Sequence, residues 1–95
     1  MNQNYGSFIW NTEKALLNHA RHGILFTDAC LAFLDPNRVI ARDARHSQKE
    51  ERLFCVGRVN GRVMTVRFVY REEQIRIIGA GYWRKGNKLY ENKKN

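Results

Sequence analysis

The sequence has one proline, two cysteines and no long apolar run, and each shortage narrows the class of protein. With so little proline and 43% hydrophobic residues, the composition is typical of a globular chain rather than a disordered one. No apolar run approaches the roughly 20 residues that cross a bilayer. The polar N-terminus lacks the basic-then-apolar order of a signal peptide. We therefore expect one cytoplasmic domain over residues 1–95, without a membrane partner, in which residues 1–7 and 92–95 are flexible.

The two cysteines, Cys30 and Cys55, do not indicate a metal site. Neither belongs to a CxxC pair or to the Cys/His spacing of a zinc site. Isolated cysteines in a cytoplasmic protein are usually buried as small apolar side chains. The sequence also lacks a phosphate-binding glycine loop and a nucleophile elbow. We therefore expect neither a metal nor a cofactor.

Acidic residues are scarce in the later part of the chain, so the formal net charge of +8 is unevenly placed. Residues 1–35 hold two basic residues, Lys14 and Arg21, against three acidic ones, whereas residues 36–95 hold 15 against six. Such an excess attracts phosphate backbones or an acidic protein partner. The alternative is a basic surface that only keeps the protein soluble. The many arginines favour recognition, because the planar guanidinium suits phosphate.

The first third of the sequence predicts two helices. Asn11 is a good N-cap for a helix over Thr12–His22, and Gly23 can end it in a left-handed conformation. Its expected apolar face consists of Leu16, Leu17 and Ala20. Thr27 is the expected cap of a second helix over Asp28–Leu34, which stops before proline. A short strand or docking segment at Phe8–Trp10 precedes both helices.

After residue 37 the pattern changes to the alternation of β-strands. The dipeptide Asn60-Gly61 between two β-rich runs is a strong hairpin signal. A loop is expected over Asp43–Glu51 and a short C-terminal helix over Arg84–Asn92. The predicted strands are Arg38–Arg42, Arg52–Val59, Arg62–Tyr70 and Gln74–Ala80. The fold class is therefore α+β, with two N-terminal helices packed on an antiparallel β-sheet meander.

Alternation along the third of these strands predicts which side chains meet the helices. One face carries Met64, Val66, Phe68 and Tyr70, and we expect it to be covered. Arg67 then projects from the opposite face, where Arg76 of the next strand can join it.

Two segments of the sequence carry a recognisable pattern. In the first, Arg21-His22-Gly23 ends the predicted helix and is followed by Phe26 and Ala29. In the second, Asp43–Arg52 fits the pattern Asp-x-x-His-Ser-x-x-Glu-Glu-Arg. The remaining parts are Asp35-Pro36, Val56-Gly57, Gly61-Arg62, Ile75–Ile78 and Tyr90-Glu91. Over roughly residues 8–91, this combination resembles the BrnT family.

The resemblance implies a fold similar to that of RelE ribonucleases, with helices packed on an antiparallel sheet. It also implies a toxin of a type II toxin–antitoxin system, which cleaves RNA and arrests translation. Each BrnT protein is neutralised by an antitoxin, BrnA, which carries a ribbon-helix-helix DNA-binding part. We therefore expect an RNA substrate, a BrnA-like partner, and contact with DNA only through that partner.

One position departs from the family pattern. Many BrnT proteins have Ser-Ala-Arg after the last strand, whereas this chain has Gly79-Ala80-Gly81. If the family arginine is catalytic, its role here passes to Arg84 or Lys85, or it is lost. The alternative function is therefore a catalytically weakened or inactive module on the same scaffold, which binds RNA or the antitoxin.

A metal-independent ribonuclease needs a base for the 2′-hydroxyl proton, cations for the charge on the phosphate, and an acid for the leaving 5′-oxygen. His46 is the first candidate for proton transfer. The alternative is a histidine that anchors its loop through Glu50 or a backbone carbonyl. Glu51 beside Arg52 is a further candidate, and the alternative there is a salt-bridged loop. The expected catalytic residues are His46, Glu51, Arg52, Arg67, Arg76 and Arg84.

An aromatic and basic cluster follows the last predicted strand. Aromatic rings stack on unpaired bases while cations hold the RNA backbone, and Tyr82, Trp83 and Lys85 combine both features. The alternative is that Trp83 closes the edge of the core. Similarly, the strand arginines either bind phosphate or protect a sheet edge from aggregation. The expected RNA-binding residues are Arg71, Tyr82, Trp83 and Lys85.

Overall fold

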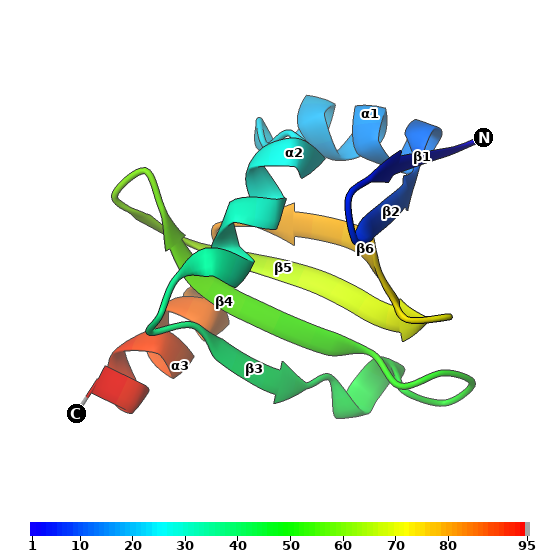
Figure 1. Ribbon diagram of the computed structural model, residues 1–95. Helices are drawn as coiled ribbons and strands as arrows, with labels where there is room; N and C mark the ends of the chain where they lie inside the picture. Colours follow the sequence, from blue (N-terminus) through cyan, green and yellow to red (C-terminus); the bar gives the residue numbers. More distant parts are fainter. Residues whose placement is uncertain (95) are drawn as a thin grey trace.

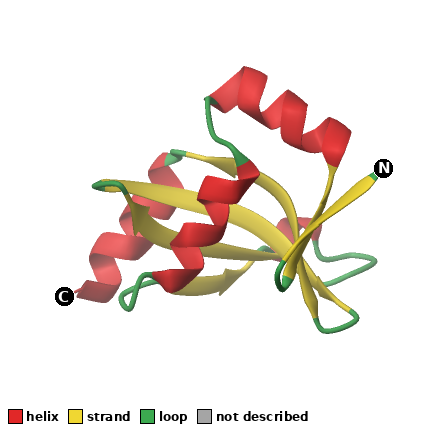
Figure 2. Cartoon of the chain, turned by 45° about the horizontal axis from the view of Figure 1, so that its top comes forward, coloured by secondary structure: helices red, strands yellow, loops and turns green. Residues whose placement is uncertain are grey.

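The computed structural model describes residues 1–94, which form a six-stranded sheet with helical segments on both of its faces (Figures 1 and 2). In their side-by-side order, the strands are β1 (Asn2–Tyr5), β2 (Phe8–Asn11), β6 (Gln74–Gly81), β5 (Arg62–Arg71), β4 (Leu53–Val59) and β3 (Val39–Arg42). The α-helices are α1 (Thr12–His22), α2 (Phe26–Ala29) and α3 (Arg84–Lys94), and the 3₁₀ turns are η1 (Cys30–Leu34) and η2 (Ala44–His46).

The structure confirms the α+β class, but the expectation of a purely antiparallel sheet is wrong. β2 pairs with β6 in parallel, with Phe8 opposite Ile75, and the other neighbouring strands are antiparallel. The short strand expected at Phe8–Trp10 is present as β2, whereas β1, which precedes it, was not predicted. The chain crosses from β2 to the far edge of the sheet at β3, and the meander then returns β6 beside β2 in the same direction.

Two predicted element ends are confirmed in their atomic detail. The Asn11 side chain accepts a hydrogen bond from the Lys14 N–H at 3.0 Å, and Gly23 ends α1 with a φ of 69°. Asn60 and Gly61 have φ angles of 51° and 81° and join β4 to β5 in the expected hairpin. These signals are local, so the sequence was sufficient to place them.

The second helix differs from its prediction. α2 is only four residues long, and the chain continues as the 3₁₀ turn η1. Leu25 rather than Thr27 precedes its first turn, and no side chain caps it. Phe26, which is 2% exposed, fixes this earlier start because its ring packs edge-on against Trp10 in the core. Burial of an aromatic ring here outweighs the local preference for a hydroxyl cap.

The core lies between the sheet and the α2–η1 segment. Met64, Val66 and Phe68 are fully buried there, as the alternation of β5 predicted, but Tyr70 is 59% exposed and the prediction for it is wrong. Tyr70 stands next to the last residue of β5, and its ring packs edge-on against that of Phe68 near the end of the strand.

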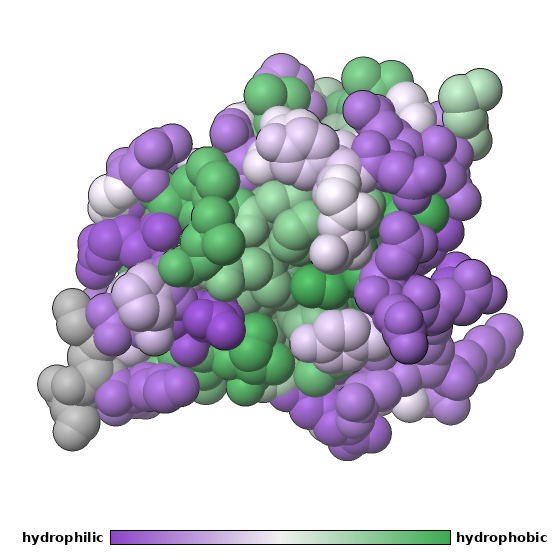
Figure 3. Space-filling view, in the orientation of Figure 1, coloured by the Kyte–Doolittle hydropathy of each residue, from purple (hydrophilic) through white to green (hydrophobic). Residues whose placement is uncertain are grey.

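The predicted apolar face of α1 is also wrong. Leu16 and Leu17 are 68% and 51% exposed. The buried residue of this helix is Asn18, whose Nδ2 donates to the Ile24 carbonyl at 3.4 Å and whose Oδ1 accepts from the Ala80 N–H at 3.1 Å. A hydrogen bond from Ala80 to Asn18 thus attaches α1 to β6. Apolar groups gather on the face of the molecule that α2 and η1 cover (Figure 3).

The expected C-terminal helix is present as α3, on the opposite face from α2 and η1 (Figure 1). The close approach of α3 to β5 requires Gly86 in the first turn of this helix. A Cβ atom at residue 86 would lie too close to the Thr65 hydroxyl. Farther along α3, the Tyr90 hydroxyl donates to Asp35 Oδ2 at 2.6 Å, which ties α3 to the end of η1.

β1 lies within residues 1–7 and α3 continues through residues 92–94, although these ends were expected to be flexible. All four β1 residues are exposed. Asn95 lies outside the described residues. The flexibility of both ends therefore stays a prediction.

Replacing Tyr90 with phenylalanine is expected to destabilise the fold, mainly above acidic pH. Burial by itself raises the pKa of Asp35, but hydrogen bonds from the Tyr90 hydroxyl and the N–H groups of Arg58 and Asn37 outweigh it, so the net pKa lies below its ordinary value of 3.8. The stabilisation from a lowered pKa is present above the unfolded-state pKa and is lost as pH falls. We expect Tyr90→Phe to cost about 1–2 kcal/mol at pH 7.

Urea unfolding at pH 7 and pH 3 measures this effect. The difference in unfolding free energy between parent and variant should shrink at pH 3, because this pH lies below 3.8, the ordinary pKa at which the unfolded-state carboxyl of Asp35 takes up its proton. An equal difference at both pH values would show that the Tyr90 hydroxyl acts independently of the Asp35 charge.

Candidate active site

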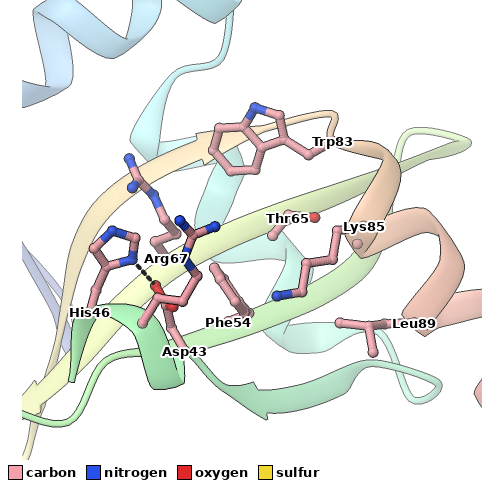
Figure 4. Close-up of a pocket in the computed structure, with 10 residues that line it drawn as sticks. Asp43, His46, Phe54, Thr65, Arg67, Trp83, Lys85 and Leu89 are labelled. Atoms are coloured by element: carbon pink, nitrogen blue, oxygen red, sulfur yellow. Dashed lines mark hydrogen bonds and ion pairs between the residues drawn. The ribbon is translucent and has the colours of Figure 1, made fainter.

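A pocket of about 520 Å³ lies on the face of the sheet opposite α2 and η1, beside α3 (Figure 4). Phe54 comes from β4, Thr65 and Arg67 come from neighbouring β5, and the loop after β3 adds Asp43 and His46. The start of α3 and the turn before it complete the wall with Trp83, Lys85, Gly86 and Leu89. Segments that are distant in the sequence thus converge on one hollow.

A carboxylate holds the imidazole of His46 in this pocket. The turn η2 folds the ring back, so that Nδ1 lies 2.9 Å from Asp43 Oδ2. Asp43 is 4% exposed, whereas the His46 side chain is 55% exposed. A carboxylate can only accept a hydrogen bond, so in the neutral imidazole this contact favours the proton on Nδ1 and leaves a lone pair on Nε2. This is the tautomer that a general base needs.

Ser47 and Arg52 close the loop that carries Asp43 and His46, which we call the dyad. The Ser47 hydroxyl donates to the Asp43 carbonyl at 2.6 Å and accepts from the Arg52 N–H at 3.0 Å. The Asp43 N–H donates to the Arg52 carbonyl at 2.8 Å. The sequence offered Glu50 as an alternative partner that anchors His46 to its loop. In the structure, the partner of the His46 side chain is Asp43 instead. The segment Asp43–Arg52 thus acts as one structural unit.

Two smaller hollows extend the pocket and share its basic residues. One, of about 250 Å³, includes Arg67 and Arg52 together with Lys14 and Arg21 of α1. The other, of about 300 Å³, includes His46, Arg52, Arg45 and Lys49. We name the joined surface the basic groove, and its members are Lys14, Arg21, Arg45, His46, Lys49, Arg52, Arg67 and Lys85. Within residues 1–94, none of its lysines or arginines forms an ion pair.

Two glycines of β6 provide a flat floor for side chains of the groove. Arg67 lies over Gly79, where an added Cβ would come within 2.8 Å of Nη2. The indole of Trp83 lies over Gly81, where an added Cβ would come within 2.5 Å of the ring. The Arg67 Cζ is 5.5 Å from the Trp83 ring centre, which is a cation–π distance. Both side chains are therefore positioned by the absence of a side chain beneath them.

Comparison with protein families matches residues 10–87 to the ribonuclease toxin BrnT of type II toxin–antitoxin systems. The chain belongs to the BrnT family. Comparison with curated proteins gives no match. Membership confirms the resemblance and indicates a ribonuclease toxin, and a type II system implies an antitoxin protein as partner.

The departure from the BrnT pattern at Gly81 has a structural explanation. The Trp83 ring occupies the space directly above Gly81, so an arginine side chain at that position would meet the indole. Arg67 and Lys85 supply positive charge around the same ring and the pocket that it lines. The tryptophan and the glycine are therefore a matched pair.

The structure brings together only part of the predicted site. His46, Arg67, Trp83 and Lys85 line the pocket, and Arg52 lines both adjoining hollows. The other candidates lie outside these hollows. They are Glu51, Arg71, Arg76, Tyr82 and Arg84.

Two of the residues outside the pocket, Glu51 and Arg71, are paired with other side chains, and Arg76 lies near the second pair. Glu51 Oε2 lies 3.3 Å from Arg42 Nε, and Arg71 makes a two-pronged contact with Glu50 at 2.7 and 3.2 Å. The hydrogen bond from Arg71, with the nearby charges of Arg71, Arg52 and Arg76, lowers the pKa of Glu50. These arginines therefore share a compensating negative charge.

The remaining two residues are exposed beside α3. The Tyr82 ring lies 3.5 Å from the Arg62 guanidinium carbon, in a cation–π contact. Arg84 is exposed at the first position of α3. Neither residue is directed to the pocket by a contact among the described residues.

Six pocket residues were missed at the level of sequence, namely Asp43, Arg45, Phe54, Thr65, Gly86 and Leu89. Asp43 was part of the quoted motif, and its spacing of three from His46 was the available signal. Arg45 lies between them. Phe54 and Thr65 alternate with core residues on their strands, and only the sheet register places them on the pocket face.

The side chains that can bind metals are scattered in the structure. Within residues 1–94, no group of three or more His, Cys, Asp and Glu side chains is arranged to hold a metal ion. As predicted, Cys30 and Cys55 are buried, and burial raises their pKa values to about 11 and about 12. Among the helices of this part of the chain, none has the length and apolar character for a membrane span.

Restoring the family arginine is expected to impair this BrnT protein rather than improve it. In Gly81→Arg the new side chain displaces the Trp83 indole, so RNA binding should weaken by about tenfold, the lower end of what one stacked base contributes. Indole fluorescence reports the displacement, because the other tryptophan, Trp10, is 3% exposed and belongs to the core. Tighter RNA binding with unchanged fluorescence would contradict the matched-pair explanation.

Proposed function

We propose that this BrnT protein is a metal-independent endoribonuclease that cleaves RNA in the pocket beside His46 and thereby arrests translation in the cytoplasm. The observation that carries the proposal is the hydrogen bond between Asp43 and His46 within the basic groove. An oriented imidazole beside guanidinium groups supplies a base and phosphate-binding charge. Helices on the antiparallel strands β3 to β6 also support kinship with the fold of RelE ribonucleases.

In the proposed reaction, His46 Nε2 removes the proton from a ribose 2′-hydroxyl. The 2′-oxygen then forms a bond to phosphorus, and the bond from phosphorus to the 5′-oxygen breaks. Lys85, which carries the only ammonium group among the pocket residues, donates a proton to the leaving oxygen. The products are a 2′,3′-cyclic phosphate and a 5′-hydroxyl, so no water or metal ion enters this step.

Arg67 and Arg45 are the proposed ligands of the phosphate in the transition state. Negative charge grows on the phosphate oxygens as the 2′-oxygen attacks, and fixed guanidinium groups stabilise it most at that point. The Arg67 Nε is buried and has no hydrogen-bond partner within residues 1–94. A bound phosphate offsets the cost of such a desolvated cation. Arg52 then holds the flanking backbone, where the two smaller hollows meet.

For the candidates outside the pocket we propose secondary contacts with flanking RNA. Arg76 projects from the same face of the sheet as Arg67, since it pairs with Val69 while Arg67 pairs with Gly79. Arg84 and Tyr82 are exposed beside the pocket wall. Glu51 and Arg71 are already paired with other side chains, so we assign them no catalytic step.

A BrnA-like antitoxin with a ribbon-helix-helix DNA-binding part is the proposed partner, and it provides the only route to DNA. Two features support a protein partner beyond the family description. The net charge of +8 is self-repulsive when uncovered. In addition, Leu16 and Leu34 are 68% and 74% exposed, and exposed apolar surface of this kind is typical of protein interfaces.

Expression of the toxin alone tests the proposal in cells. Induction should stop growth with loss of RNA integrity, and co-expression of the antitoxin encoded beside it should restore growth. Purification from the native host should recover a hetero-complex at moderate salt. A harmless protein that is recovered without a partner and leaves RNA intact would favour the inactive binding module instead.

A further inference from the structure

The pocket beside His46 is larger and more apolar than a phosphate site needs to be. A phosphate is held by charged and polar groups, which the basic groove already provides on either side of the pocket. The pocket itself has about 520 Å³ of space and an apolar wall formed by Phe54, Trp83 and Leu89. Such a volume and such a wall fit a flat, mainly apolar group of ring size.

The wall presents an aromatic ring that is held in place. Trp83 rests with its indole on Gly81, and the His22 ring meets it edge-on with ring centres 5.5 Å apart. Trp83 is only half-buried, so the indole remains available on its pocket side. A ring that is fixed before binding loses little conformational freedom when a ligand stacks on it.

Two cations, Lys85 and Arg67, border the same wall, and neither forms an ion pair within residues 1–94. Lys85 Nζ lies 5.6 Å from the centre of the Phe54 ring, and Arg67 is the cross-strand neighbour of Phe54. An aromatic surface bordered by cations is the arrangement that proteins use for unpaired bases of single-stranded nucleic acid. A base in a duplex cannot present its face to such a wall, because its neighbours in the helix already stack on it.

We propose that the pocket holds one unpaired nucleobase, stacked on Trp83, which belongs to the nucleotide whose 2′-hydroxyl His46 activates. The inference rests on the proposed ribonuclease function and specifies its substrate as RNA that is single-stranded at the cleavage point. Cleavage then falls directly 3′ to an unpaired nucleotide. The base and the reacting hydroxyl lie on one ribose, and the base wall and His46 border one pocket.

Two measurements test the inference separately from the reaction. The first measurement compares the affinities of the protein for a nucleoside 3′-monophosphate and for ribose 5-phosphate. Quenching of indole fluorescence reports the binding of each probe. Both probes carry the phosphate, but only the nucleotide carries a base, so the nucleotide should bind at least about tenfold more tightly. Trp83→Leu should abolish this difference in affinity, whereas Trp83→Phe should keep most of it. Because both variants lack the Trp83 indole, their binding of the two probes is measured by NMR. Equal binding of the two probes by the parent protein would overturn the inference.

The second measurement uses one hairpin RNA with a single bulged nucleotide and its fully paired counterpart. The bulged RNA should be cut 3′ to the bulge, and the paired stem about 100-fold more slowly, because extruding a paired base costs several kcal/mol. Tyr70→Ala is the matched control, since Tyr70 is an exposed aromatic residue outside the pocket. Equal cleavage of both RNAs would overturn the inference while leaving the ribonuclease intact. Preferential nucleotide binding without any cleavage would instead overturn the proposed function alone.

Discussion

Alanine in place of His46 is expected to lower the rate of RNA cleavage at least about 100-fold, the usual contribution of a general base. Among the described residues, the imidazole is the pocket group that the Asp43 carboxylate orients, through a bond of 2.9 Å to Nδ1. Removing the ring leaves the arginines in place, so RNA binding should change little. Cells that express His46→Ala should therefore grow, while the variant still binds both RNA and antitoxin.

Two further variants separate proton transfer from loop structure. Asp43→Asn keeps the size of the side chain, but its amide can favour the wrong tautomer of His46, so cleavage should fall while RNA affinity holds. His19→Ala is the matched control, because His19 is an exposed histidine of α1 outside the basic groove. Parental cleavage rates in both His46→Ala and Asp43→Asn would remove the dyad from the mechanism.

Arg67→Ala is expected to have an effect of similar size for a different reason. Loss of one fixed donor to a transition-state oxyanion typically costs about 100-fold to 1,000-fold in rate. Arg67 meets the requirement of fixed position, since it lies flat over Gly79 beside Trp83. Single-turnover cleavage should fall by this factor, with a smaller loss in RNA affinity.

A change beneath Arg67 tests its position without removing its charge. In Gly79→Ala the new Cβ would lie 2.8 Å from the end of a flexible side chain, so the fold should survive while the guanidinium shifts. The rate should fall, but less than in Arg67→Ala. Lys88→Ala removes an exposed charge of α3 outside the groove and is the charge-matched control. If Lys88→Ala and Arg67→Ala slow cleavage equally, the effect is one of general charge rather than of a positioned donor.

The parts of the fold that the sequence predicts well depend on local contacts. The cap at Asn11, the end of α1 at Gly23 and the hairpin at Asn60-Gly61 each involve residues that are neighbours along the chain. The parallel pairing of β2 with β6 joins Phe8 to Ile75, and no local pattern encodes such a distant partner. The sequence therefore predicts the elements better than their order in the sheet.

The face that a short helix buries is similarly undetermined by its pattern. Leu16 and Leu17 suggested an apolar contact for α1, but the helix attaches to β6 through Asn18 instead. A buried asparagine needs partners whose positions only the assembled fold reveals, here the Ile24 carbonyl and the Ala80 N–H. The exposed leucines are then free for a partner protein.

In the candidate site, too, some residues were predictable from the sequence, whereas their contacts were not. His46 was predictable because few side chains titrate near neutral pH. Its orientation by Asp43 depends on the turn η2, and the capture of Arg71 by Glu50 depends on two segments that meet only in the fold. The reason for a glycine rather than an arginine at residue 81 also became clear only from the structure, in which the Trp83 ring lies directly over Gly81. The residue type thus indicates which chemical role a side chain can take, whereas the tertiary structure decides which side chains it contacts.

The most direct test of the central claim is the chemical nature of the RNA ends that the purified protein produces in EDTA. Cleavage by His46 and the basic groove should give 2′,3′-cyclic phosphate and 5′-hydroxyl ends at an undiminished rate, and His46→Ala should yield almost none. Ends with a 5′-phosphate, or cleavage that EDTA abolishes, would contradict the account, because either result requires an attacking water or a metal ion that this site does not use.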